Sequence, residues 1–432
     1  MEVVVLPAEP AGLFRSAGSE GLRVEEHHRR PLVEDLVERA AAHREVRRHL
    51  TPSQHRPTIV PSRVPAQPDR IAIAPRGGPM RAVIVGSGSE IPPTVVTNRM
   101  LSRVMDTSDE WIRERSGVET RYYVEPGTTT SDLGVAAARR ALVAARVEPS
   151  AVDLVVFATM TPDHYFPGAG PLLQAKLGLG NVPCFDIRQQ CVGFLYGLQL
   201  VDAHVRAGLA RTVLLVGAEV HSGFMPYTAA NWDYLYGRTD VPPTPAEHEW
   251  NSRFRHLTVL FGDAGAAVVM RAEEDGSRGV IDQVLGTDGA EYDKLYVPGT
   301  GFKHRPYTDP EQFARGDHIP VMDGRYVFKL ATTRMVEVAQ QVLERNRVTI
   351  DDVSLVLMHQ ANRRINEHCQ KVLGIPDAKV IHNIQKYGNT TAATIPLLWD
   401  EAAREGRLRQ GDLVLLVAFG AGMSWGATLV RA

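Results

Sequence analysis

The stretch VDAHVRAGLARTVLLVGAE at residues 201–219 returns in altered form as WDEAAREGRLRQGDLVLLVAFGAG at residues 399–422. In both stretches a helical pattern ends at a glycine, a short basic link follows, and an apolar run of strand length comes next. A further apolar run precedes each copy, starting at Asp153 and at Val353. The repeat predicts two fused copies of one strand–helix unit, which is a duplicated α/β fold.

Four apolar runs have the length of strands: AVDLVVFAT (151–159), TVLLVGAE (212–219), VSLVLMH (353–359) and DLVLLVAFG (412–420). Runs that are apolar throughout suit strands buried on both faces of a parallel or mixed sheet. Helical patterns such as TTSDLGVAAARRALVAA lie between them and open with residues suited to an N-cap. We therefore expect layered mixed sheets and helices, with ligand-binding residues meeting at the carboxyl ends of the strands.

Composition narrows the functional class. The chain has 432 residues, 44% of them hydrophobic, and a formal net charge of -2, which does not favour a nucleic-acid partner. No apolar run approaches the roughly 18 to 20 residues that a membrane-spanning helix needs. Three cysteines, Cys184, Cys191 and Cys369, do not suggest a disulfide scaffold and favour a reducing cytoplasm.

Three regions are expected along the chain. Residues 1–79 contain no Lys, Cys, Trp or Tyr and are rich in Pro and Arg, which predicts a poorly ordered extension. Residues 80–270 form the first α/β half, with an insert at about 224–256, and residues 271–432 form the second half.

Cys191 stands where the strand VPCFDI leads through a polar turn into a long helical pattern. A helix N-terminus carries a positive partial charge and free N–H groups, so this position predicts a lowered thiol pKa and a nucleophilic thiolate. Taken alone, a cysteine at a helix start is more often a small buried filler, which is how we interpret Cys184 and Cys369.

Two more polar residues occupy equivalent junctions. His359 directly follows the strand VSLVLM, and Asn389 lies in the turn KYGNTTAATIP before a helix. Each alone has a structural interpretation, but Cys, His and Asn at three strand-to-helix junctions of a duplicated chain indicate a nucleophilic enzyme. The sequence has no GK[ST] phosphate loop and no CxxC or HExxH metal motif, so we expect no metal.

From Met80 to Ala432 the chain resembles the thiolase superfamily, and within it the beta-ketoacyl-acyl-carrier-protein synthase III family. The stretches that carry the resemblance are DTSDEWIRERSGVETR, FPGAG, the Cys191 segment, FGDAGAAVV, MDGRYVFKLA, HQAN, GNTTAA and AFGAGMSWG. The resemblance implies a thiolase-like fold, a homodimer, and decarboxylative condensation of an acyl group from acyl-CoA with a malonyl group on an acyl carrier protein. It implies no cofactor beyond these substrates.

The resemblance also assigns residues. It makes Cys191 the acyl-accepting nucleophile, places His359 and Asn389 on the malonyl thioester carbonyl, and forms an oxyanion hole from the backbone N–H groups of Cys191 and Ala421. The family usually has glycine where Ala421 stands. The other matches are Trp111 and Arg115 at the mouth of the pantetheine tunnel, Phe328 and Asn362 along it, Phe166 reaching across the dimer interface, Phe419 near the nucleophile, and Arg364 in carrier docking.

Related activities remain open at this point. The stretch GAGMSWG lacks the second cysteine of degradative thiolases, and His with Asn differs from the two His of elongating synthases. The alternatives are an acyltransferase of specialised metabolism with a non-malonyl acceptor, and a catalytically silent partner subunit, which retention of Cys191 disfavours.

The insert FMPYTAANWDYLYGRTDVPPTPAEHEWNSRFRHLTVL departs from the family, which is shorter here. The family's Arg-Gly pair, which contacts the coenzyme A adenine, cannot be placed in it. Loops of this length are usually functional or disordered, so a lid near the tunnel or acyl pocket and a passive surface elaboration are both open.

Overall fold

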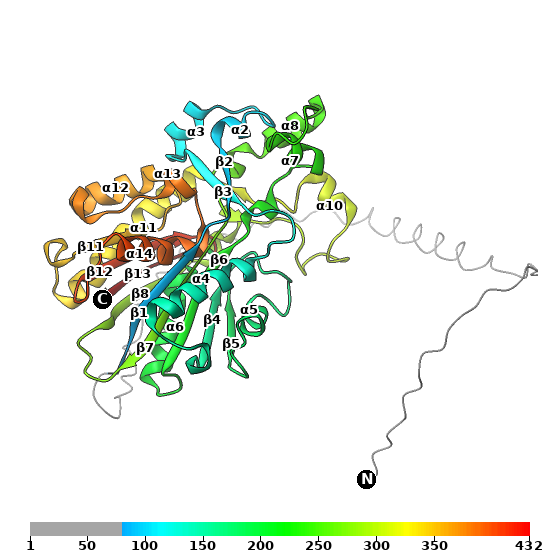
Figure 1. Ribbon diagram of the computed structural model, residues 1–432. Helices are drawn as coiled ribbons and strands as arrows, with labels where there is room; N and C mark the ends of the chain where they lie inside the picture. The colour runs from blue at the N-terminus through cyan, green and yellow to red at the C-terminus, as the bar shows by residue number, and fades with distance from the viewer. Residues whose placement is uncertain (1–79) are drawn as a thin grey trace, which may run out of the picture. The chain divides into compact units, whose positions relative to one another are not determined.

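The computed structural model describes residues 80–432 (Figure 1). The predicted extension of residues 1–79 lies outside the described residues. The structure contains two mixed sheets. The first has the order β1 (Arg81–Glu90), β7 (Ala264–Glu273), β6 (Thr212–Glu219), β4 (Leu154–Ala158), β5 (Cys184–Ile187). The second has the order β11 (Leu355–Met358), β12 (Leu413–Gly420), β13 (Ser424–Arg431), β8 (Gly279–Thr287).

The two sheets repeat one topology. β4 runs parallel to β6, which pairs antiparallel with β7, which pairs antiparallel with β1. In the second sheet β11, β12, β13 and β8 follow one another with the same directions. The first sheet adds β5, parallel to β4. The duplication predicted from the two sequence stretches is confirmed, and with it the thiolase-like arrangement of mixed sheets and helices.

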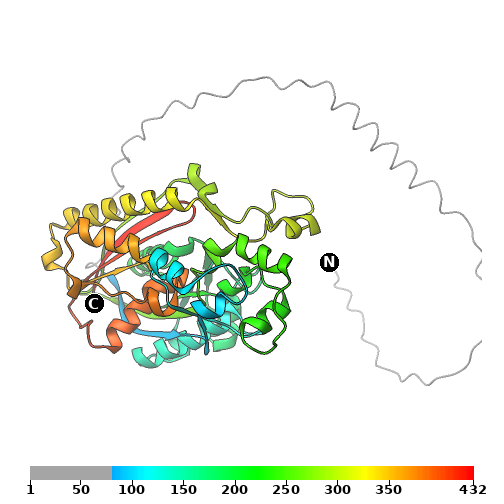
Figure 2. The same cartoon turned by 90° about the horizontal axis from the view of Figure 1, so that it is seen from above.

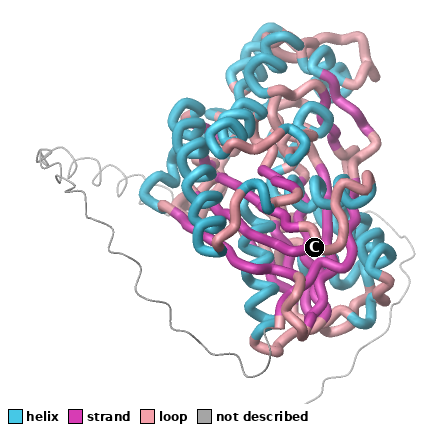
Figure 3. Tube along the Cα trace, turned by 90° about the vertical axis from the view of Figure 1, so that its left-hand side faces the viewer, coloured by secondary structure: helices cyan, strands magenta, loops and turns pink. Residues whose placement is uncertain are grey.

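Helices separate and cover the sheets (Figure 3). α6 (Gly193–Arg206) and α14 (Thr394–Arg404) form a middle layer, since each contacts strands of both sheets. α4 (Thr130–Ala145) and α5 (Gly170–Leu177) pack on the first sheet, and α11 (Gly324–Asn346) packs on the second, with α12 (Arg363–Leu373) beside it. Each sheet is therefore buried by helices, which explains why its strands are apolar throughout.

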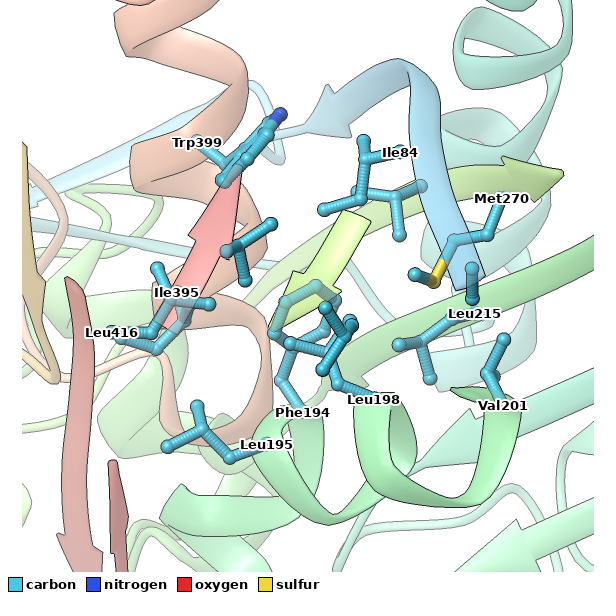
Figure 4. Packing of buried hydrophobic residues seen from close by; sticks show 14 of the residues in the cluster. Ile84, Phe194, Leu195, Leu198, Val201, Leu215, Met270, Ile395, Trp399 and Leu416 are labelled. Carbon is cyan, nitrogen blue, oxygen red and sulfur yellow. The ribbon is translucent and has the colours of Figure 1, made fainter. Parts of the chain in front are cut away.

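The largest hydrophobic cluster lies around this middle layer (Figure 4). Phe194, Leu198 and Val201 recur at helical spacing along α6 and are fully buried. They meet Leu215 of β6, and Trp399 of α14 lies in the same cluster. Truncating one such leucine to alanine typically costs about 2 to 5 kcal/mol of unfolding free energy. The cluster thus fixes the two halves, whose strand ends carry the site.

A smaller layer of short elements lies beside the sheets and contains the insert (Figure 2). It comprises β2 (Thr94–Thr97), α2 (Asn98–Leu101), α3 (Asp109–Ser116), β3 (Thr120–Tyr123), α7 (Ala229–Leu235), α8 (Pro245–Arg253) and α9 (Arg255–Thr258). The insert therefore folds into helices rather than a long loop. Asn251 of α8 donates to the backbone oxygen of Val104 at 3.0 Å and to Asn231 of α7 at 2.7 Å, which anchors it.

The remaining regular elements are short. They are β9 (Leu295–Tyr296), α10 (Pro310–Arg315), β10 (Val321–Met322) and α13 (Ile384–Tyr387). Within residues 80–432, no helix combines the length and the apolar character needed to cross a lipid bilayer.

Candidate active site

Cys191, His359 and Asn389 line one cavity, which encloses about 100 Å³. Cys191 lies in the short 3-10 turn η3 (Gln190–Val192) that precedes α6, and His359 directly follows β11. Asn389 precedes the turn η8 (Thr391–Ala393) at the start of α14. Three segments far apart in the sequence thus meet at the strand ends, as the duplicated topology predicts.

The turn that carries Cys191 is tightly constrained. Gln190, just before it, has a φ of 44°, in the left-handed region that non-glycine residues rarely adopt. Gly420 lies against the cysteine, because a Cβ built there would be 2.8 Å from the Cys191 Cβ. The end of β12 must therefore carry a glycine for the nucleophile to sit where it does.

Two backbone N–H groups face the thiol, those of Cys191 itself and of Ala421, and both act to lower its pKa. The φ of Ala421 is not positive, so its backbone conformation does not require glycine. An alanine therefore fits where the resembled family usually has glycine. Two backbone donors thus converge on the sulfur of Cys191.

The predicted direction of the Cys191 pKa shift is wrong. Burial raises the pKa of the thiol to about 12, and the charge of Glu219 raises it further, while the two N–H groups lower it without compensating. The sequence shows the helix start but not the depth of burial. In the free protein Cys191 is therefore a neutral thiol.

His359 is also buried and neutral. Burial lowers the pKa of its imidazole to about 3, and neither ring nitrogen has a hydrogen-bond partner among residues 80–432. The backbone N–H of His359 donates to Val417 of β12 at 2.9 Å, which fixes the residue at the strand end. Its ring nitrogens are thus available to a ligand in the cavity.

Asn389 is held by both its backbone and its side chain. Its N–H donates to Leu260 at 2.8 Å, its carbonyl oxygen accepts from Gly262 at 3.1 Å, and its Oδ1 accepts from the N–H of Thr391 at 2.9 Å. Because the side-chain oxygen is already used, the amide Nδ2 is the atom that can donate to a ligand.

Three of the other predicted residues line the same cavity: Phe328 of α11, Asn362 and Phe419. Asn362 caps α12 by accepting from the N–H of Arg364 at 2.9 Å, and its Nδ2 donates to the carbonyl oxygen of Arg115 at 2.8 Å. This asparagine therefore ties α12 to α3 at the cavity wall.

Trp111 and Arg115 lie on α3 and are not among the residues that line the cavity. The Trp111 ring has the Arg115 guanidinium over it at 4.6 Å and that of Arg255 at 4.8 Å. Arg255 also forms an ion pair with Asp106. Since Arg255 belongs to the insert, this segment reaches the residue that the resemblance puts at the tunnel mouth.

Phe166 and Arg364 lie at the surface. Phe166 is 81% exposed, in the loop between β4 and α5. Arg364 is exposed on α12, with its guanidinium 5.8 Å from the Phe328 ring. Cys184 and Cys369 lie in β5 and α12, outside the residues that line the cavity with Cys191.

Sequence reasoning missed Glu219, the last residue of β6. Its buried carboxylate accepts from the Thr159 hydroxyl at 3.0 Å, from the Met160 N–H at 3.1 Å, and from the Thr161 N–H at 3.1 Å and hydroxyl at 2.6 Å. Burial raises the pKa of Glu219 to about 7 despite these donors. An acidic residue closing the apolar run TVLLVGAE is the signal that could have identified it.

Solved structures of condensing enzymes share this architecture. That of 3-oxoacyl-[acyl-carrier-protein] synthase III from Aquifex aeolicus matches with a TM-score of 0.69 and 36% sequence identity, covering 81% of this chain and 100% of that chain. The priming beta-ketosynthase of a polyketide biosynthetic pathway matches with a TM-score of 0.69 and 30% identity, covering 81% and 96%. The fold is therefore that of a thiolase-like condensing enzyme, an acyltransferase.

Sequence comparison specifies the family. Models of 3-oxoacyl-[acyl-carrier-protein] synthase III match residues 185–238, and models of its C-terminal part match residues 343–432. A beta-ketoacyl-[acyl-carrier-protein] synthase III of Streptomyces coelicolor is 42% identical over 80% of this chain and 96% of its own length. The chain belongs to the beta-ketoacyl-acyl-carrier-protein synthase III family.

Proposed function

We propose that the protein condenses an acyl group, received from acyl-CoA, with malonyl-acyl-carrier protein, releasing CO₂ and forming a 3-oxoacyl-carrier product. The observation that carries this proposal is the single cavity that Cys191, His359 and Asn389 line, with the backbone N–H groups of Cys191 and Ala421 facing the thiol. These groups supply a nucleophile, an oxyanion hole and two donors for a second carbonyl.

The first half-reaction is acyl transfer. The sulfur of Cys191 attacks the thioester carbonyl, the carbonyl oxygen accepts from the two backbone N–H groups, and coenzyme A leaves. The bond between the acyl carbon and the coenzyme sulfur breaks, and the proton of the Cys191 thiol ends on the departing thiolate. Because burial holds the pKa of this thiol near 12, the sulfur loses its proton as it attacks rather than before.

The second half-reaction forms the new carbon–carbon bond. The malonyl carboxylate leaves as CO₂, and its electron pair becomes an enolate whose oxygen accepts from His359 and from Nδ2 of Asn389. The enolate carbon attacks the acyl carbon on Cys191, the acyl–sulfur bond breaks, and the sulfur takes a proton from solvent. Each neutral donor supports the developing charge without protonating it, at a typical gain of ~10² to 10³ in rate.

The pantetheine arms of both substrates enter along the cavity wall formed by Phe328 and Asn362. Trp111, with Arg115 and the insert's Arg255 over its ring, provides an aromatic and cationic surface at the mouth. Arg364, exposed on α12, offers a positive charge to an acidic carrier protein. The insert thus belongs to the entrance rather than to a remote surface.

We further propose that two copies of the chain associate, with the exposed Phe166 inserting into the partner's acyl pocket. An 81% exposed phenylalanine beside the half-exposed Tyr165 makes an apolar surface that association would bury. The reaction as written needs no metal and no cofactor besides its substrates. Three free cysteines fit a cytoplasmic setting.

The proposal is tested with purified protein, acetyl-CoA and malonyl-carrier. We expect an acetyl mass shift on the peptide containing Cys191, and CO₂ release equal to the 3-oxoacyl product. Cys191→Ala should abolish the mass shift, whereas Cys369→Ala, a buried thiol outside the cavity, should retain it. Acylation that persists in Cys191→Ala would contradict the nucleophile, and acyl transfer without CO₂ would favour a non-malonyl acceptor.

A further inference from the structure

His221, two residues beyond the end of β6, is a buried polar side chain. It is 1% exposed, and neither Nδ1 nor Nε2 has a hydrogen-bond partner among residues 80–432. Buried polar atoms are nearly always paired, so each unpaired one requires an explanation. Its condition matches that of His359, whose ring nitrogens are also buried and unpaired.

The ring of His221 lies against the wall of the Cys191 cavity. It stacks on the Phe261 ring, with centroids 3.7 Å apart and an interplanar angle of 4°, and Phe261 lines the cavity with Cys191. The backbone of Phe261 bridges to that of Asn389. Glu219, at the end of β6, is close enough to Cys191 for its charge to raise the pKa of that thiol. His221 therefore stacks on one neighbour of Cys191 and follows another by two residues in the chain.

A second cavity lies near the same ring. Phe224, 5.5 Å from His221 between ring centroids, lines a cavity of about 620 Å³ together with Met160, Thr161, Val220 and Tyr307. His221 thus contacts Phe261, which lines the narrow Cys191 cavity, and Phe224, which lines the larger one. An acyl chain that extends from Cys191 toward the larger cavity would come close to the imidazole.

The neighbouring carboxylates do not bond the ring of His221, although Asp263 accepts from the backbone N–H of this residue. Asp263 accepts from the N–H and hydroxyl of Ser222 and from the N–H of Val124, and Glu219 accepts from Thr159, Met160 and Thr161. Burial lowers the pKa of His221 to about 3, so the ring is neutral, with one N–H donor and one acceptor nitrogen. A hydroxyl group is the complement of such a ring, because it both accepts and donates.

We propose that His221 selects the acyl group loaded on Cys191, by hydrogen-bonding a hydroxyl carried on the acyl chain. This inference rests on the proposed acyl transfer to Cys191. A purely aliphatic chain would leave both ring nitrogens unpaired, and sites built to bond a hydroxyl reject analogues that lack it.

The test compares matched acyl-CoA pairs: 3-hydroxybutyryl-CoA with butyryl-CoA, and 5-hydroxyhexanoyl-CoA with hexanoyl-CoA. The readout is the second-order rate of acyl transfer to Cys191, followed by intact mass. For the full chain we expect the hydroxylated member of at least one pair to react ~10-fold faster or more. Equal or faster transfer of the unsubstituted chain in both pairs would overturn the proposal, and this comparison needs no variant.

Variants of His221 then test whether this residue causes the preference for the hydroxylated chain. His221→Phe keeps a ring on Phe261 but removes both nitrogens. The ratio of the transfer rates of the hydroxylated and unsubstituted acyl-CoA should therefore fall to within ~2-fold of unity. His221→Asn, whose side chain is both a donor and an acceptor, should retain part of the preference. His204→Leu is the control, because Nδ1 of His204 already bonds the carbonyl oxygen of Leu200 on the same helix. An unchanged ratio in His221→Phe would overturn the role of His221.

The two proposals fail in different ways. If no acyl-CoA of either pair, and no acetyl-CoA, modifies Cys191, the proposed function itself is wrong. If the unsubstituted chains load and condense with loss of CO₂ while the hydroxylated chains gain nothing, only the selection by His221 is wrong. His221→Leu replaces His221→Phe should the latter not fold.

Discussion

The two halves share one strand topology (Figure 1). They differ in the residues at the ends of matching strands. Thr159 follows β4 where His359 follows β11, and Glu219 ends β6 where Gly420 ends β12. In the first half the two side chains bond each other at 3.0 Å. In the second half the histidine ring has no hydrogen-bond partner in the described part of the chain, and the glycine leaves room for Cys191. The side chains at the strand ends of the first half are thus hydrogen-bonded to each other, whereas those of the second half leave space and hydrogen-bonding groups for a ligand.

The turns before α6 and α14 extend the comparison. Gln190 and Thr391 occupy equivalent positions, with left-handed φ values of 44° and 52°. The residue after each is Cys191 in one half and Ala392 in the other. The same strained turn therefore carries a thiol in one half and a methyl group in the other, so the two halves differ here in a single side chain.

The largest expected effect is that of a substitution at Asn389, in the second half. Asn389→Ala removes the Nδ2 donor, so condensation should fall ~10² to 10³-fold while acylation of Cys191 changes little. Asn389→Asp should be at least as damaging, because a carboxylate repels the enolate. Separate measurement of Cys191 acylation by mass and of CO₂ release from malonyl-carrier checks this, and equal loss of both would contradict the assigned role.

The glycine at the end of β12 provides the next test. Gly420→Ala places a Cβ 2.8 Å from that of Cys191, so the turn must shift, and acyl transfer should fall by ~10²-fold. Gly289→Ala is the matched control, because a Cβ there meets nothing within 4 Å. The acylation rate by rapid-quench mass spectrometry decides it, and a variant as fast as the Gly289 control would show that the close approach is unimportant.

The next prediction concerns Glu219, in the first half, and its effect on the pKa of Cys191. The charge of this carboxylate raises the pKa of Cys191, so Glu219→Gln should lower it and increase the rate of iodoacetamide alkylation at pH 8. A change of half a pKa unit would give about a threefold increase. Glu401→Gln, a buried carboxylate bonded to Asn383 and Tyr387, is the control and should not change the rate. A slower reaction in Glu219→Gln would contradict the electrostatic link.

The last prediction concerns stability rather than rate. The folded pKa of His221 is lowered to about 3, so its neutral form stabilises the fold above the unfolded pKa of about 6.5, and this stability is lost as the pH falls. His221→Phe removes one such group, so its unfolding free energy should fall less steeply between pH 6 and 5, by ~1.4 kcal/mol per pH unit. Glu219 and Asp263 remain in both proteins and cancel. Urea unfolding at several pH values checks this, and parallel pH dependences would contradict it.

The sequence predicted the duplication and the three residues that meet in the cavity, because strand ends of a repeated α/β unit must converge. It could not predict the ionisation of Cys191, since burial by the other half outweighs the N–H groups at the helix start. The helical insert was missed although Thr244, Pro245 and Glu247 form a capping signal for α8. His221 and Glu219 were missed because pairing and burial appear only in three dimensions.

The central claim is that one acyl group on Cys191 is consumed for each malonyl group decarboxylated. The direct measurement isolates the acylated protein, adds malonyl-carrier, and follows the acyl mass on Cys191 and CO₂ in a single turnover. The account predicts equal rates and a ratio of one to one, with the acyl group recovered in the 3-oxoacyl product. Loss of the acyl group without CO₂, or CO₂ release that leaves the acyl group on Cys191, would contradict it.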